Sequence, residues 1–275
     1  MSDLRLRARS VTEIVDAAFQ LYKRDALEYV LVAGIAYAPL VVAQLIFMRG
    51  MTLGSAAAFN ATVSGSIVVV IVSIFAYSLM SAVLSRFSSD VYLERPTGLA
   101  EVIRDVVKLV PRLIGAAFLY GLVFVLGFLP AIIGLRLNNG LLIFLGVVIA
   151  MVWIFYALAR FFAIYQLIVL ENRGVVEAFA RSGVLSKNRK GHILLTLTLI
   201  FVIFVMLSSA VTVIAGIVGS TTVSVVLQTV YTVVAYPLVG ITQMILYYDA
   251  RIRAEGFDIE VMTGALGAPS ATSPT

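Results

Sequence analysis

Long apolar runs, separated by short polar segments, follow one another along most of the chain. Each run has about 20 residues or more, which at ~1.5 Å per helical residue is enough to cross roughly 30 Å of bilayer hydrocarbon. The six runs are Tyr29–Met48, Val63–Ser85, Leu113–Leu135, Leu141–Ala159, Ile193–Val218 and Thr222–Tyr248. They are continuous, whereas the strands of a membrane β-barrel alternate between polar and apolar positions. The pattern therefore predicts an all-α integral membrane fold with six transmembrane helices.

The composition excludes a soluble globular domain. Apolar residues make up 61% and charged residues 13% of the 275 positions, against roughly 45–50% and about 25% in soluble domains. The chain has no cysteine and a single histidine, His192, so the usual thiolate and multi-histidine metal sites cannot be built. We expect neither a metal nor a cofactor.

Charged residues occupy only one set of connecting segments. All but three of the 20 basic residues, and all 15 acidic ones, fall in the N-terminal segment, the second-to-third connection, the fourth-to-fifth connection and the C-terminal tail. The exceptions are Arg49, Arg136 and Arg160. By the positive-inside rule both termini face the cytoplasm, in a multi-pass protein of the cell membrane. The net charge of +5 is thus explained by topology, and we expect no nucleic-acid partner.

Each basic segment that precedes an odd-numbered span also carries an amphipathic helical pattern. The three patterns lie at 11–22, 99–110 and 175–181, and we expect these helices to lie in the membrane interface. The repetition divides the chain into three approximate units, 10–97, 98–173 and 174–260, each an interfacial helix followed by a hairpin of two spans. We expect one membrane domain over residues 1–260 and a disordered tail over 261–275.

The three amphipathic patterns begin in a similar way. Ser10 and Glu13 form the pattern of a capping box, in which the serine accepts a hydrogen bond from the N3 amide and the glutamate accepts one from the cap amide. The other two patterns place glycine at the cap and glutamate at N3, as Gly98 with Glu101 and Gly174 with Glu177. We interpret these glutamates as capping residues rather than catalytic ones.

Three segments of the chain resemble a known family. They are Ser10–Tyr22, the run from Val169 to Leu185 with Ala178-Phe179-Ala180-Arg181-Ser182 inside it, and the tail Leu246–Asp258. Together they resemble the glycerophosphoryl diester phosphodiesterase membrane domain family of bacteria and archaea, although Gly183 stands where that family often has tryptophan. Too few residues follow the last span for the soluble phosphodiesterase barrel, which needs about 250 residues. The resemblance therefore implies a stand-alone membrane domain, and it carries over no catalytic residue.

Polar residues recur along one face of the sixth span. At three- to four-residue spacing they include Gln228, Thr232, Tyr236, Gln243 and Tyr247. A face of this kind avoids lipid, so its side chains either bond to neighbouring helices or line a path for a solute. Both interpretations stay open at this stage.

Arg160 is the only candidate for a charge buried in the membrane. It stands near the end of the fourth span, where a long basic side chain can reach the membrane surface. The other interpretation is a buried ion pair, with Glu171 first and Asp90 second as the partner.

The sequence favours a non-catalytic membrane protein that interacts with lipids or with a protein through its basic cytoplasmic collar. Anionic membrane lipids are the expected partner, and a protein partner or a homo-oligomer is also compatible. The candidate lipid-headgroup contacts are Lys187, Arg189 and Lys190, which can equally serve only to fix the topology. The alternative is a small-solute transporter or permease subunit that uses the polar face of the sixth span. A third possibility, an intramembrane lipid-modifying enzyme, would depend on His192 as its acid-base group.

Overall fold

The computed structural model describes residues 7–50, 56–95 and 98–256, which form helices and no strand. Six helical segments are long and apolar enough to cross a membrane, which confirms the predicted fold class at that level. The long helices are α2 (Ala26–Gly50), α3 (Ala56–Tyr92), α5 (Val110–Gly127), α7 (Gly140–Arg160), α10 (Lys190–Val218) and α11 (Thr221–Glu255). The short ones are α1 (Val11–Arg24), α4 (Leu99–Lys108), α6 (Leu129–Arg136), α8 (Ile164–Leu170) and α9 (Val175–Leu185).

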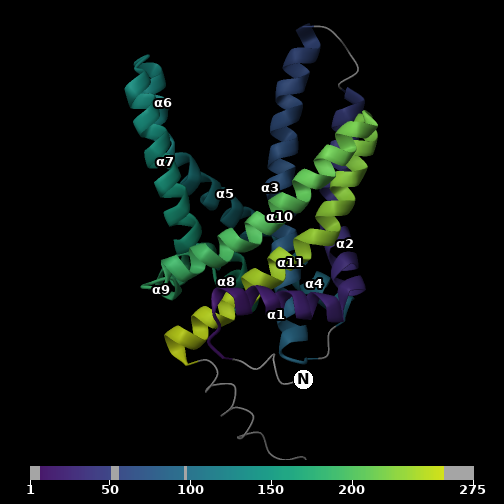
Figure 1. Cartoon of the computed structure of the whole chain (residues 1–275), viewed down its shortest axis with the longest axis vertical. Coiled ribbons are helices and arrows are strands. Elements are labelled where there is room, and N and C mark those ends of the chain that lie inside the picture. The colour runs from purple at the N-terminus through teal and green to yellow at the C-terminus, as the bar shows by residue number, and fades with distance from the viewer. Residues whose placement is uncertain (1–6, 51–55, 96–97, 257–275) are drawn as a thin grey trace, which may run out of the picture.

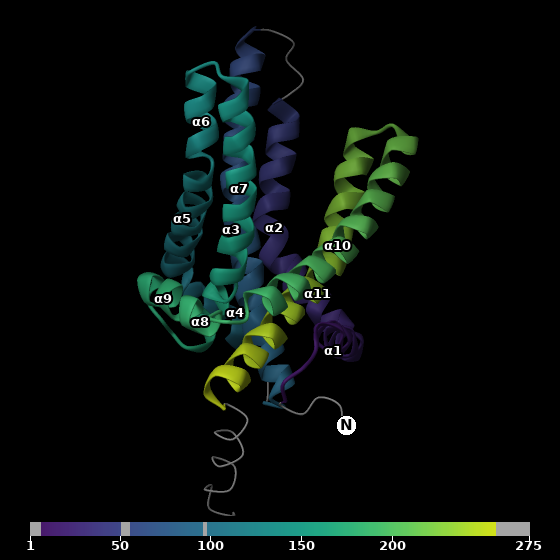
Figure 2. The ribbon, with the colours of Figure 1, turned by 60° about the vertical axis from the view of Figure 1, so that its left-hand side comes forward.

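The long helices form three hairpins that meet at one end of the molecule and diverge towards the other. The most extensive contacts join α2 to α3, α6 to α7 and α10 to α11. The tip of the α6–α7 hairpin stands apart from the other two in Figure 1, and the tip of the α10–α11 hairpin does so in Figure 2. We call the end that holds α1, α4, α8 and α9 the basal end, and the opposite end the hairpin end.

The packed core lies in the basal half of the bundle. Its largest fully buried side chains come mainly from α1, α2, α3 and α8, and include Leu21, Tyr29, Met80, Phe87 and Leu167. Beyond that core, α7 and α10 expose large apolar side chains such as Met151, Phe201, Met206 and Ile217. A continuous apolar surface of this kind suits contact with lipid hydrocarbon rather than with water.

The helix boundaries differ from the predicted spans in several places, and α3, for example, extends beyond the predicted second span at both ends. The third span is broken at Phe128, between α5 and α6, because Pro130 lacks an amide hydrogen and stands at the start of α6. The sixth span continues beyond Tyr248 to Glu255 and ends at Gly256, whose φ of 66° is a left-handed helix cap. A short helix, α8, follows the fourth span, where the sequence indicated only a connection.

Candidate functional site

A cavity of about 560 Å³ lies where the three hairpins meet, and it is partly open rather than enclosed. Residues from α3, α5, α7, α8, α10 and α11 line it. Its polar side chains are hydroxyls and one amide, namely Ser73, Tyr77, Ser78, Ser81, Tyr120, Tyr165, Tyr236 and Gln243. None of the 18 lining residues is charged. The cavity is therefore polar in places and electrically neutral throughout.

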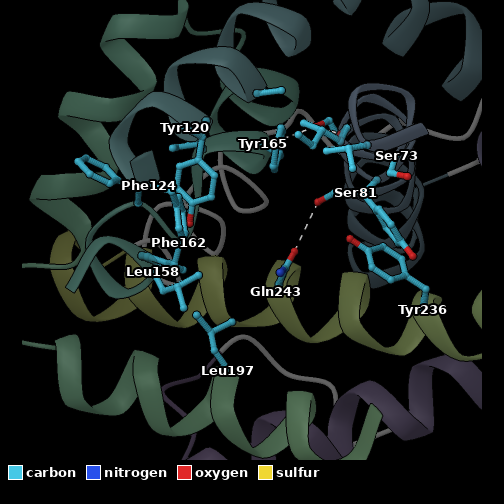
Figure 3. Close-up of a pocket in the computed structure, with 18 residues that line it drawn as sticks. Ser73, Ser81, Tyr120, Phe124, Leu158, Phe162, Tyr165, Leu197, Tyr236 and Gln243 are labelled. Atoms are coloured by element: carbon cyan, nitrogen blue, oxygen red, sulfur yellow. Dashed lines mark hydrogen bonds between the residues drawn. The ribbon is translucent and has the colours of Figure 1, made fainter. Parts of the chain in front are cut away.

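Figure 3 shows how the cavity wall is divided. Gln243 from α11 points its amide towards Ser81 of α3, and the two oxygens are 3.4 Å apart. Tyr236 lies beside them, with its ring centre 5.3 Å from that of Tyr77. The rings of Tyr120 and Phe124 from α5 form the facing wall. Hydrogen-bonding groups thus gather on the α3–α11 side, opposite a largely aromatic surface.

Below the cavity, serines of α3 form a ladder of hydrogen bonds to α8 and α11. Ser78 bonds to the Tyr165 hydroxyl at 2.8 Å, Ser85 accepts from Gln166 Nε2 at 3.1 Å, and Ser89 bonds to the Tyr248 hydroxyl at 2.6 Å. These serines are buried. The first of these bonds lies in the cavity wall, because both Ser78 and Tyr165 line it. Sequence reasoning missed this ladder, although the three- and four-residue spacing of serines along the second span was a signal of it.

The polar stripe of α11 has three different environments. Near the hairpin end, Gln228 donates to Thr212 of α10 at 2.7 Å, and the Thr232 hydroxyl donates to the Gln228 carbonyl at 2.8 Å. In the middle, Tyr236 and Gln243 line the cavity. At the basal end, Tyr247 donates to Glu171 at 2.9 Å. The stripe therefore makes helix contacts at both ends and lines a cavity between them.

Glu171, at the C-terminal cap of α8, is the centre of a charge cluster at the basal end. Its carboxylate is 3.3 Å from the guanidinium groups of Arg173 and Arg181 and 3.9 Å from that of Arg251. Burial by itself raises the pKa of Glu171. The hydrogen bond from Tyr247 and the charges of Arg181 and Arg251 outweigh that effect and hold the pKa below its ordinary value. Glu171 is therefore ionised, and it joins α8 to α9 and α11.

The structure corrects the ion pair considered for Arg160. Glu171 pairs with the arginines named above, and Asp90 pairs with Arg86 at 2.8 Å. Arg160 instead donates to the Tyr156 hydroxyl at 3.2 Å and lies 5.6 Å from the ring centre of Phe161. Its guanidinium lies beside Gly183, where an added Cβ would be 3.2 Å from Nη2. The glycine thus leaves space for Arg160.

The three basic residues considered for lipid contact differ in their surroundings. Lys187 is exposed. Arg189 donates to the carbonyl oxygens of Ala250, at 3.1 Å, and of Arg253, near the C-terminal end of α11. The ammonium group of Lys190 lies 5.5 Å from the ring centre of Tyr156. Arg189 is therefore a structural contact to the negative end of a helix, and Lys187 is the residue best placed to meet a headgroup.

His192 belongs to a second basal cluster, around Asp249. This aspartate is 2% exposed, accepts from the backbone N–H of Arg9 at 2.7 Å and binds Arg253 Nε through both oxygens. His192 Nε2 lies 3.3 Å from the same carboxylate. His192 does not line the cavity, and the titratable side chains among the lining residues are those of Tyr77, Tyr120, Tyr165 and Tyr236.

Two of the three predicted helix caps form hydrogen bonds: Ser10 and Glu13 bond to each other in both directions, and Gly174 and Glu177 share one bond. The amide of Glu13 donates to Ser10 Oγ at 3.3 Å, and the amide of Ser10 donates to the Glu13 carboxylate at 2.7 Å. The hydrogen bond from the Ser10 amide and the one from the Arg7 guanidinium both stabilise the ionised carboxylate, and they lower the pKa of Glu13 to about 2. Gly174 donates its amide to Glu177 at 3.3 Å.

The second helix start differs from the other two. Gly98 is the cap residue of α4 and has no side-chain capping bond. The backbone amide of Glu101 donates to the Gly98 carbonyl at 3.0 Å. Glu101 therefore has the sequence position of a capping residue, but α4 does not have the reciprocal capping box that begins α1.

Within residues 7–50, 56–95 and 98–256, no group of three or more His, Cys, Asp or Glu side chains is arranged to hold a metal ion. Comparison of the chain with protein-family models, curated proteins and solved structures finds no match. The resemblance to the phosphodiesterase membrane domain family therefore stays a prediction from the residues that carry it.

Proposed function

We propose that this protein binds an uncharged amphipathic molecule in the cavity between its hairpins and acts as a permease or carrier for it, without catalysing a reaction. The observation that carries the proposal is a neutral cavity with hydrogen-bonding groups on one wall, inside an otherwise apolar bundle. Buried polar groups need partners in a hydrocarbon environment, and a ligand hydroxyl would supply them. A charged ligand would meet no opposite charge there.

The proposed orientation places the basal end in the cytoplasm, in the cell membrane, with both termini on that side. Basic residues gather at this end, as the positive-inside rule requires of cytoplasmic segments. The serine ladder then lies towards the cytoplasm, and the hairpins diverge towards the other side of the membrane (Figures 1 and 2). We further propose that residues 10–97, 98–173 and 174–260 are three related units. Each begins with a short basal helix, α1, α4 or α9, followed by one hairpin, and the second unit also contains α8.

Cysteine labelling tests the proposal directly, because the chain has no cysteine of its own. We expect Ser73→Cys, on the cavity wall, to react with a membrane-permeant maleimide in proteoliposomes at least about tenfold faster than Ala76→Cys, one turn away and fully buried. Octyl glucoside, an uncharged amphiphile, should slow the labelling of Ser73→Cys. Octyl sulfate and octyltrimethylammonium, which have the same chain and a charged head, should not.

Two results would contradict the proposal. Equal labelling rates for the two cysteines would mean that the cavity is not accessible. Protection by the charged amphiphiles to the same extent as by octyl glucoside would mean that the neutral wall does not select its ligand.

A second candidate function is attachment of the basal helices to an anionic leaflet. The observation that favours it is apolar exposure on those helices, where Val107 of α4 is 57% exposed and Val176 and Val184 of α9 are 75% and 59% exposed. An amphipathic helix in the interface buries such side chains among the lipids. The exposed Lys187 would add an attraction to anionic headgroups, worth about 1 kcal/mol.

Lys187→Gln is expected to weaken binding of the detergent-purified protein to liposomes that contain phosphatidylglycerol by about fivefold. Its midpoint of thermal unfolding should not change, because Lys187 is exposed. Arg189→Gln is the matched control, and it should lower that midpoint because it removes the bonds to Ala250 and Arg253. Unchanged liposome binding by Lys187→Gln would discard the attachment function.

A further inference from the structure

A second hollow, of about 400 Å³, lies between α3 and α5. All nine residues that line it are apolar: Ile71, Ile74, Phe75, Ile114, Ala117, Phe118, Gly121, Leu122 and Val125. Its rim faces outwards, because Phe118 is 75% exposed and Ile114 and Val125 are more than half exposed. Both helices belong to membrane-spanning segments. The hollow is thus an apolar groove on the surface that would contact lipid.

The groove adjoins the neutral cavity. Ile74, Ala117 and Gly121 line both hollows. A Cβ added at Gly121 would meet no atom within 4 Å, so the glycine leaves the junction open. The lipid-facing groove between α3 and α5 and the cavity that contains Ser81 and Gln243 are therefore neighbours, with open space at Gly121 where they meet.

We infer that the occupant is a single membrane lipid with an uncharged hydroxyl head, which enters sideways from the bilayer between α3 and α5. The head lies in the cavity and the hydrocarbon chain lies in the groove. This inference rests on the proposed function and narrows its ligand to one class, esters of glycerol with a fatty acid and similar neutral lipids.

The chemistry of the two hollows selects this class. The groove offers only apolar side chains, which suit a hydrocarbon chain and give a polar solute nothing to bind. The cavity offers hydroxyls and an amide, which can bond to hydroxyl groups. A phosphate head would have to leave water without an opposite charge among the lining residues, and that transfer is strongly unfavourable. A free sugar has no hydrocarbon chain that could occupy the apolar groove.

The test uses a monoacylglycerol with a photoactivatable diazirine in the middle of its acyl chain. After irradiation in proteoliposomes, we expect the probe to attach to α3 and α5, at residues such as Phe75, Phe118 and Leu122, in excess over α10, although α10 is the more exposed helix. Unlabelled monoacylglycerol should compete for these sites, and phosphatidylglycerol should not.

Gly121→Leu fills the junction and should reduce the attachment to α3 and α5 by about tenfold. The matched control is Gly216→Leu on α10, where an added Cβ also meets no atom within 4 Å, and it should leave the attachment unchanged. Gly121→Ala should give an intermediate reduction, so the result does not depend on a single bulky substitution. Attachment spread evenly over all exposed helices, or equal in the Gly121 and Gly216 variants, would overturn the inference.

Failure of this inference can be told apart from failure of the proposed function. If octyl glucoside still protects Ser73→Cys while the lipid probe shows no preference for α3 and α5, the cavity binds a ligand that does not enter through the groove. If octyl glucoside gives no protection, the cavity itself has no such ligand, and both statements are wrong.

Discussion

Replacing Glu171 with glutamine is expected to lower the free energy of unfolding by about 2 kcal/mol. The carboxylate is 11% exposed and holds Arg173, Arg181 and Arg251 at the basal end. Without its charge, Arg173 loses its carboxylate partner, and Arg181 and Arg251 keep only Glu255, which lies 2.6 Å and 3.3 Å from them. Glutamine keeps the size of the side chain, so the change removes charge and little packing. Unfolding of the purified protein in mixed micelles, followed by circular dichroism, would measure the loss.

Glu28→Gln is the matched control, because Glu28 is exposed and lies in the first turn of α2. It should change the free energy of unfolding by less than about 0.5 kcal/mol. Equal effects of the two substitutions would show that the Glu171 cluster does not stabilise the basal end.

The same cluster predicts a pH dependence. The folded pKa of Glu171 is lower than its ordinary value of 4.5, so the unfolded chain binds this proton more readily than the folded one. The stabilisation is therefore complete above about pH 4.5 and is lost as the pH falls through the folded pKa. The difference in stability between the wild type and Glu171→Gln should shrink between about pH 5 and about pH 3. A difference that stayed constant over this range would contradict the assignment.

Replacing Gly146 with alanine is expected to destabilise the α6–α7 hairpin by about 2–3 kcal/mol. A Cβ at Gly146 would overlap the backbone of Ala131, and a Cβ at Gly134 would be 2.6 Å from the backbone nitrogen of Ile143. The two helices thus approach each other through their glycines, and a backbone cannot rotate away as a side chain can. Thermal unfolding in detergent would report the change.

Gly140→Ala is the control for this substitution. Gly140 begins the same helix, and an added Cβ meets no atom within 4 Å. Alanine favours a helix over glycine by about 1 kcal/mol, so Gly140→Ala should keep or raise the midpoint while Gly146→Ala lowers it. Two substitutions that shifted the midpoint in the same direction would argue against the close approach.

Several features could be predicted from the sequence because their causes are local. A run of about 20 apolar residues is a membrane-spanning segment whatever surrounds it, so the six spans were predictable with errors of a few residues at their ends. The capping box of Ser10 and Glu13 depends only on residues three positions apart. The break near Pro130 also has a local cause, the amide hydrogen that proline lacks.

The candidate site depends on contacts between distant segments, which hydropathy does not encode. Arg160 and Glu171 are only eleven positions apart, yet the turn between α8 and α9 directs Glu171 towards Arg181 and Arg251 instead. Ser81 and Gln243 belong to different hairpins, and only their packing brings the two side chains to one cavity wall.

What the sequence determined by itself is therefore the class of the protein, its spans and the gathering of charge in alternate segments, because each of these follows from the cost of placing polar groups in hydrocarbon. What only the tertiary structure decided is how the hairpins tilt. That tilt opens a neutral cavity and an apolar groove between helices whose sequences are almost uniformly apolar. Uniform hydrophobicity says which residues avoid water, and it leaves undetermined which of them face lipid, a neighbouring helix or a ligand.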